Sequence, residues 1–132
     1  MQAVTDDSGV VLSALFEGGP LGPGTSFGTP ADWPLQVGTL KHPAGHVIKP
    51  HRHSRVPGFD HQRQEVLVVL SGRLRCDIYD NGGSFREAVI VGPGSILMLM
   101  GGGHGVEFLE DTLVVEVKQG PYVADEKVPL DA

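Results

Sequence analysis

The sequence has one cysteine, no concentration of basic residues and no long hydrophobic run, and each absence excludes a class of protein. Cys76 alone cannot form a disulfide within the chain, so we expect a reducing compartment, the cytoplasm. With 10 Lys and Arg against 16 Asp and Glu, the formal net charge is −6, which argues against nucleic-acid and membrane partners. The longest apolar stretches, Val66–Leu70 and Ile96–Met100, are too short to cross a bilayer. Asp6 and Asp7 lie where a secretory signal would be basic.

Short apolar runs recur along the 132 residues and are separated by turn residues, including many of the 19 Gly and 10 Pro. Arg73–Tyr79 alternates polar and apolar residues with the period of two that is typical of a half-buried strand. The pattern predicts an all-β sandwich or barrel. The expected strands are Val10–Phe16, Leu35–Lys41, His46–His53, Glu65–Leu70, Arg73–Tyr79, Phe85–Val91, Ser95–Met100, His104–Glu110 and Leu113–Gln119.

The chain is long enough for one domain, which we divide into three segments. Residues 1–34 are expected to form an N-terminal strand and an irregular loop arm that packs on the barrel, because Glu17–Pro34 is rich in Gly, Pro, Ser and Thr. Residues 35–119 are expected to form the β-barrel itself. Residues 120–132 are expected to form an extended C-terminal tail.

Four residues are candidate metal ligands. His51 and His53 are two positions apart on an expected strand, so their imidazoles should point to the same face. Glu65 begins an apolar strand, where a carboxylate is out of place unless it is paired or bound to a metal. His104 follows three consecutive glycines between two expected strands. Three imidazoles and one carboxylate suit one divalent transition metal (Zn, Fe, Mn, Ni, Co or Cu) better than Ca or Mg.

The spacing of these residues resembles the first motif of the cupin family, G-x5-H-x-H-x3–4-E-x6-G, with Gly45, His51, His53, Glu65 and Gly72 in its positions. Eleven residues, Ser54–Gln64, separate His53 from Glu65 where the family has three or four. This insertion indicates an enlarged hairpin loop. The resemblance implies a single-domain double-stranded β-helix, or jelly-roll barrel, with the four candidate ligands around one metal.

The family's second motif, G-x5-P-x-G-x2-H-x3-N, is matched in part. Gly101 and His104 agree with its G-x2-H. Leu99 stands in place of the proline and Phe108 in place of the asparagine, and the first glycine is displaced by one position to Gly92 or Gly94. Because one fold hosts many activities, the resemblance predicts the fold and not the reaction.

The resemblance favours a metal-dependent enzyme of the isomerase, epimerase or dioxygenase type, acting on a small polar, carbohydrate-related molecule. The candidate catalytic residues are His61, Glu107 and Lys118. Glu116 and Lys118 alternate with valines on the last expected strand, so they either face solvent or line the mouth of the barrel. The alternatives are a non-catalytic metal-dependent binding or sensor protein and a metal-free barrel similar to sugar-nucleotide epimerases. We also expect a homodimer, because a lone barrel leaves sheet edges uncovered.

Overall fold

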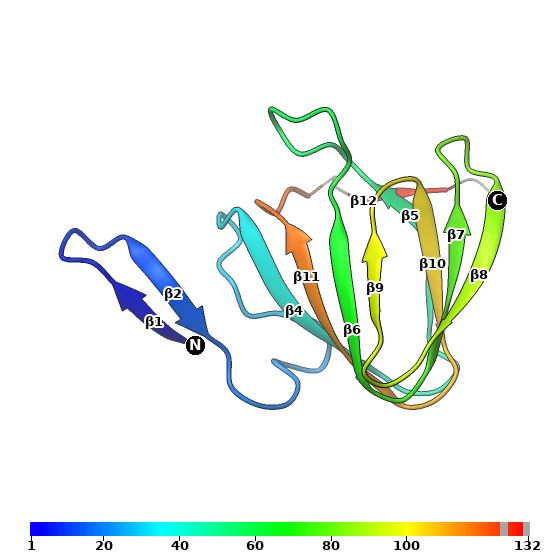
Figure 1. Ribbon diagram of the computed structural model, residues 1–132, viewed down its shortest axis with the longest axis horizontal. Helices are drawn as coiled ribbons and strands as arrows, with labels where there is room; N and C mark the ends of the chain where they lie inside the picture. Colours follow the sequence, from blue (N-terminus) through cyan, green and yellow to red (C-terminus); the bar gives the residue numbers. More distant parts are fainter. Residues whose placement is uncertain (125–126, 131–132) are drawn as a thin grey trace.

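The computed structural model describes residues 1–124 and 127–130, and this part of the chain contains strands and turns but no helix. It therefore contains no helix that could cross a membrane. The prediction of an all-β fold is confirmed. Most of the chain forms two sheets that face each other, and a separate N-terminal hairpin projects to one side (Figure 1).

Each of the two facing sheets has five strands. The order in the first sheet is β12 (Lys127–Pro129), β5 (Val47–His53), β10 (Gly103–Phe108), β7 (Leu74–Tyr79) and β8 (Phe85–Val91). The order in the second is β3 (Gly24–Phe27), β4 (Leu35–His42), β11 (Thr112–Gln119), β6 (Glu65–Ser71) and β9 (Ile96–Leu99). All neighbouring strands in these sheets are antiparallel.

The nine predicted strands are all present, with ends that differ by at most two residues. Three further strands were not expected. One of them, β3, lies within Glu17–Pro34, so the prediction of an irregular loop is wrong at Gly24–Phe27, where Thr25 and Ser26 pair with β4. The expected C-terminal tail contributes β12, which pairs with β5. Residues 125–126 and 131–132 of that tail lie outside the described part of the chain.

The N-terminal hairpin consists of β1 (Gln2–Thr5) and β2 (Val11–Leu15), which pair only with each other among the described strands. Its strands carry exposed Val4, Val11 and Leu12 side chains. The chain contacts the barrel just after the hairpin, where the ring of Phe16 lies against Gly28 so closely that a Cβ on Gly28 would be 2.7 Å from it. In this structure the hairpin is an appendage of the barrel.

The two sheets enclose an interior that changes in character along the strands. On β11, Thr112, Val114, Glu116 and Lys118 are buried and the residues between them are half-buried. An apolar cluster fills one end of the barrel, where Phe108 and Val114 are completely buried. Gly72 closes a turn there with a φ of 82°, and a side chain at this position would meet the backbone of Asp111. The other end holds the buried histidines His51, His53 and His104 together with Glu65, Glu116 and Lys118.

Candidate metal centre

A cavity of about 310 Å³ opens at the polar end of the barrel. Both sheets contribute to its walls, because most of its lining residues come from β3, β4, β5, β6, β10, β11 and β12. The lining comprises Thr25, Phe27, Leu40, Ile48, His51, His53, Glu65, Leu67, His104, Val106, Glu116, Lys118, Tyr122, Ala124 and Lys127. A volume near 300 Å³ is at the small end of the range for ligand sites.

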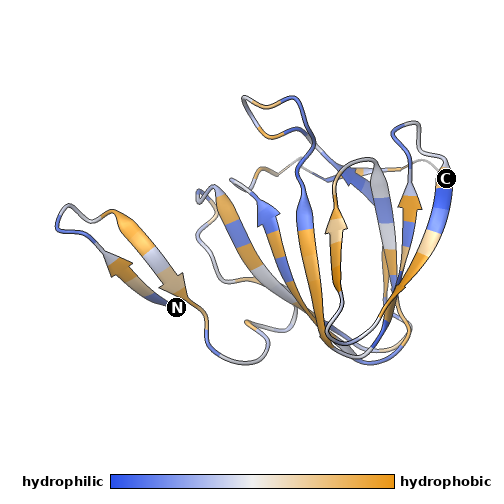
Figure 2. Ribbon diagram, viewed as in Figure 1, coloured by the Kyte–Doolittle hydropathy of each residue, from blue (hydrophilic) through white to orange (hydrophobic). Residues whose placement is uncertain are grey.

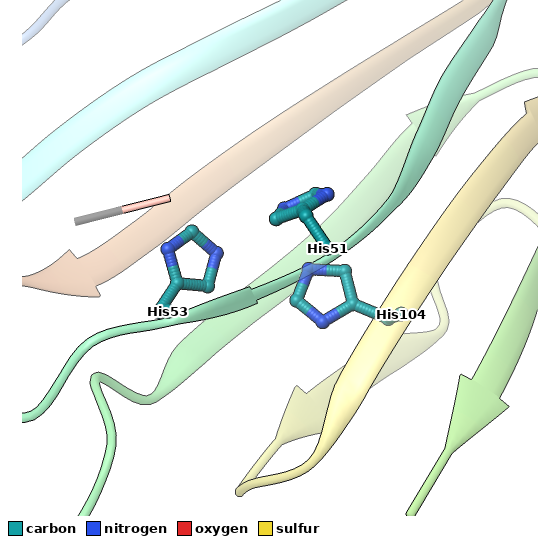
Figure 3. A group of neighbouring side chains, drawn as sticks. All are labelled: His51, His53 and His104. Atoms are coloured by element: carbon teal, nitrogen blue, oxygen red, sulfur yellow. The ribbon is translucent and has the colours of Figure 1, made fainter. Parts of the chain in front are cut away.

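Three histidines meet in this cavity, as the sequence predicts (Figure 3). His51 and His53 lie on β5, and His104 lies on the neighbouring β10 directly opposite His51. One nitrogen of each ring lies within 4.8 Å of the others, and all three side chains are buried. Donor atoms at such separations could hold one metal ion.

Glu65, from the other sheet, contacts this histidine cluster. It begins β6 and is 5% exposed, and one carboxylate oxygen lies 2.9 Å from His53 Nε2 while the other lies 3.2 Å from His104 Nε2. Burial alone would raise the pKa of Glu65. Hydrogen bonds from His104 and His53 outweigh it and hold the pKa well below the usual value. The carboxylate is therefore negatively charged beside the histidines.

The hydrogen bond of His51 determines which of its nitrogens faces a metal. Its Nδ1 lies 2.8 Å from the carbonyl oxygen of Lys49. Because a carbonyl oxygen can only accept, Nδ1 carries the proton and Nε2 retains a free lone pair. Burial lowers the pKa of His51 to about 3, so the ring is neutral near pH 7. A backbone bond of this kind is a common way to orient a metal-ligating histidine.

The residues of this cluster suit a transition metal. The cluster combines three buried imidazole side chains with one ionised carboxylate, a donor set that suits first-row transition metals. Cys76 does not add a thiolate to it, because burial raises the pKa of its thiol to about 12.

The long segment between His53 and Glu65 forms a loop whose base is held by Arg63. Arg55 and Gln62 form a β-bridge across it, in agreement with the predicted hairpin. The buried Arg63 guanidinium donates to Ser54 Oγ at 2.9 Å, to the Arg55 carbonyl at 2.9 Å and to the Pro121 carbonyl at 3.1 Å. The loop is thereby tied to the segment that leads to Tyr122 at the edge of the cavity.

The three predicted catalytic candidates lie in different places. Lys118 lines the cavity and is 8% exposed. His61 is half-buried in the inserted loop, outside the cavity lining, with Nε2 3.2 Å from Gln119 Oε1. Glu107 is exposed on β10, and it is also absent from the lining.

Two further charged residues, Glu116 and Lys127, also line the cavity. Sequence reasoning left Glu116 open between solvent and the mouth of the barrel, without naming it as a catalytic candidate, and it did not single out Lys127. Glu116 is 6% exposed and interacts with Glu65. Burial, and then the charge of Glu65, raise the pKa of Glu116 well above its usual value. The alternation along β11 placed Glu116 on the same face as Lys118, but it left open whether that face was inside or outside.

No protein-family model matches the sequence, and no curated protein matches it either. Solved structures do match. KdgF from Halomonas sp. is 23% identical, with a TM-score of 0.57 over 83% of this chain and 92% of that one. A cupin-2 domain protein from Shewanella frigidimarina is 13% identical, with a TM-score of 0.53 over 73% of this chain and 79% of that one.

A variant of oxalate decarboxylase from Bacillus subtilis is 19% identical, with a TM-score of 0.62. The match covers 84% of this chain but only 29% of that one. Another structure of the Bacillus subtilis enzyme, 19% identical, is described by its Mn(II) centres. At these identities the likeness shows the fold alone. The chain has the cupin-type fold: two antiparallel sheets form a double-stranded β-helix that contains a buried three-histidine cluster.

Proposed function

We propose that the chain is a metal-dependent enzyme that holds one divalent transition metal through His51, His53, His104 and Glu65 and acts on a small polar molecule in the cavity. The observation that carries this proposal is the convergence of three buried imidazoles, with a carboxylate in contact with two of them, inside a cavity. A bound metal of this class would polarise a carbonyl or hydroxyl oxygen of the substrate.

Glu116 favours an enzyme over a protein that only binds its ligand. A buried carboxyl group that faces the cavity, beside the candidate centre, is positioned to give or take a proton. Lys118, two residues further along the same strand face, is a second candidate for this role. In an isomerisation a proton moves between carbon or oxygen atoms, and protein side chains carry it. The presence of two such groups therefore favours an isomerisation over a reaction that needs only the metal.

The first experiment is the metal content of protein purified without a histidine tag or a chelating resin, measured by mass spectrometry. We expect about one equivalent per chain, and loss of it in the double variant His51→Ala/His53→Ala. The matched control is His42→Ala/His46→Ala. It removes two histidines whose ring centres are 3.9 Å apart and which do not line the cavity. An unchanged metal content in the His51/His53 variant would contradict the proposed ligands.

A second experiment separates an enzyme from a binding protein. The metal-loaded protein is incubated in D₂O with a panel of small hydroxy-carbonyl compounds, and deuterium entering next to the carbonyl is followed by NMR. An isomerase is expected to catalyse this exchange, and Glu116→Gln is expected to slow it by about 100-fold or more while metal stays bound. Metal binding with no exchange on any compound would favour the non-catalytic alternative.

A further inference from the structure

The outer faces of the two sheets differ in chemistry. An antiparallel sheet with water on one side commonly has polar residues outward and apolar residues inward. The first sheet follows this pattern on β7 and β10, where Arg75, Asp77 and Glu107 alternate with buried residues. Arg75 Nε lies 2.8 Å from Asp77 Oδ1 on this face. On β4, β11, β6 and β9 of the second sheet, the outward residues are instead mostly apolar.

Strand pairing arranges these apolar residues in two rows that cross all four strands. Residues directly opposite each other on neighbouring strands have side chains on the same face of a sheet. One row consists of Val37, Val117, Val66 and Met98, and the next consists of Thr39, Val115, Val68 and Ile96. Neither row contains a charged residue. Its one polar member, Thr39, already accepts a hydrogen bond from the backbone N–H of Leu21 at 2.9 Å.

The apolar surface continues from the sheet onto the N-terminal hairpin. A groove runs between them, lined by Val11 and Leu12 of β2 and by Leu35 and Val37 of β4. At the opposite side of the face, on β9, Ile96 and Met98 are exposed. One side of the face therefore adjoins the hairpin, and the other side is open to solvent.

The hairpin has the same need for an apolar partner. Val4, Leu12 and Leu15 are exposed on it, and its two strands pair only with each other among the described strands. A two-stranded hairpin is at best marginally stable in water, and packing against an apolar surface stabilises it. The molecule thus presents two adjoining apolar surfaces, the hairpin and the outer face of the second sheet.

The size of the sheet face indicates what covers it. Four strands about 4.8 Å apart, with about three outward residues on each at a spacing of ~6.6 Å, make a face of roughly 400 Å². A stable interface takes about 800 Å² from each partner. The sheet face alone falls short of this area, and the hairpin is the adjoining surface that can supply the rest. A second copy of the chain brings both surfaces, and a symmetric contact uses each of them twice.

We infer that the outer face of the second sheet is the interface of a homodimer, in which two copies pack face to face and the hairpin of each covers β9 of the other. A two-fold axis in the interface, parallel to the strands, reverses the strand order of the partner and brings its β4 side over β9. The hairpin projects from the β4 side (Figure 1). This symmetry therefore places it over Ile96 and Met98. The contact uses a sheet face rather than the sheet edges, and it does not depend on a metal.

The test begins with the molar mass in solution, measured by light scattering during gel filtration, and with the Kd of the dimer from sedimentation. We expect twice the mass of one chain. Met98→Lys then puts a charge on the proposed interface at a side chain that is 59% exposed in the single chain, so the fold should be kept. The Kd should rise by about 100-fold or more, because a symmetric interface buries the new charge in both copies.

The matched control is Ile90→Lys, which adds the same charge to the outer face of the first sheet. Ile90 is 53% exposed and lies opposite Arg75, and we expect this variant to keep the Kd of the wild type. Ile96→Lys, in the neighbouring row, repeats the test if Met98→Lys fails to fold, and circular dichroism checks each variant. Leu12→Lys tests the hairpin and should raise the Kd by about tenfold, since the hairpin supplies only part of the contact.

Three results would overturn the inference. The first is the mass of a single chain at every concentration measured. The second is a dimer with an unchanged Kd in both Met98→Lys and Ile96→Lys, and the third is an equal rise in Kd in Met98→Lys and Ile90→Lys. If Met98→Lys weakens the dimer and Leu12→Lys does not, the sheet face is the interface and the assigned role of the hairpin is wrong.

Discussion

The two ends of the barrel interior are built from the same strands but have opposite chemistry. At one end Leu74, Phe108 and Val114 pack into an apolar cluster. At the other end the inward positions of the strands hold histidines, carboxylates and a lysine. The hydropathy colouring shows this division on β6 and β11, whose lower halves are largely hydrophobic and whose upper ends are hydrophilic (Figure 2).

The difference shows that burial by itself does not select residue type in this protein. Val114 and Glu116 are inward neighbours on β11, and both are almost fully shielded from water. Val114 belongs to the apolar cluster, so its packing energy comes from area removed from water. Around Glu116 there are other ionisable groups and a cavity, so its polar atoms have partners or room for a ligand. One end supplies stability and the other contains the site.

The largest expected effect comes from moving a charge into the apolar end. Val114→Glu places a carboxylate at a position that is 0% exposed, within the apolar cluster, and adds volume to that cluster. We expect a loss of more than about 4 kcal/mol in the free energy of unfolding, enough to leave the protein largely unfolded. Circular dichroism and urea unfolding measure this. The variant with the reciprocal change, Glu116→Val, should remain folded. If both variants unfold, the two ends of the barrel do not differ in the way described.

A smaller loss is expected from a cavity in the same end. Phe108→Ala removes a completely buried ring and should lower the free energy of unfolding by about 3–5 kcal/mol. The metal content of the folded protein should not change, because Phe108 is outside the cavity lining. Phe59→Ala, at a side chain that is 58% exposed, is the control and should change stability by no more than about 0.5 kcal/mol. A loss of metal in Phe108→Ala would show that the two ends are coupled.

At the polar end, Glu65→Gln keeps the shape of the side chain but removes its charge. We expect metal affinity to fall by about 10- to 100-fold, whether Glu65 binds the metal or orients His53 and His104. The measurement is competition with a chromophoric chelator. The thermal stability of the metal-loaded protein should fall in parallel, since a ligand that binds only the folded state stabilises it. Unchanged affinity would exclude Glu65 from the centre.

The smallest effect concerns pH and the metal-free protein. The pKa of His51 is about 3 when folded, against 6.5 for a free histidine, so between these values the unfolded chain binds the additional proton. The contribution of neutral His51 is therefore fully present above pH 6.5 and is lost as the pH falls toward 3. Urea midpoints at pH 7 and pH 5 measure it.

His51→Gln isolates this contribution from that of Glu116, whose raised pKa acts in the opposite direction in the same range. We expect the variant to lose less stability than the wild type between pH 7 and pH 5. His46→Gln, an exposed histidine outside the cavity lining, should behave as the wild type does. If His51→Gln and the wild type show the same pH dependence, His51 is not buried in its neutral form.

The candidate site was largely predictable because its signals are local. His51 and His53 are close in sequence, and strand geometry alone places their side chains together. Glu65 was marked by the apolar run that follows it. Which face of β11 turns inward is instead set by pairing with β4 and β6, and a single sequence does not contain that register. For this reason the sequence left open whether Glu116 faces solvent or the mouth of the barrel.

The strands that the sequence did not predict share a different property. β1, β3 and β12 have only three or four residues each, and β3 lies among glycines and prolines that indicate a loop. Strands this short carry too few residues to show a period of two. In the case of β3 and β12, pairing with the longer β4 and β5 supplies the hydrogen bonds that hold them in place. Their existence therefore depends on the rest of the barrel.

The inserted loop offers a practical position for labelling the protein. Its base is fixed by Arg63, whereas Pro57–Asp60 at its tip are exposed. Exposed tips on a fixed base tolerate insertions well. The same Arg63 side chain reaches Pro121, which immediately precedes the lining residue Tyr122. A fluorophore attached at the tip would thus be linked through a short, ordered path to the cavity wall, and its emission could report ligand entry without a change to any residue of the site.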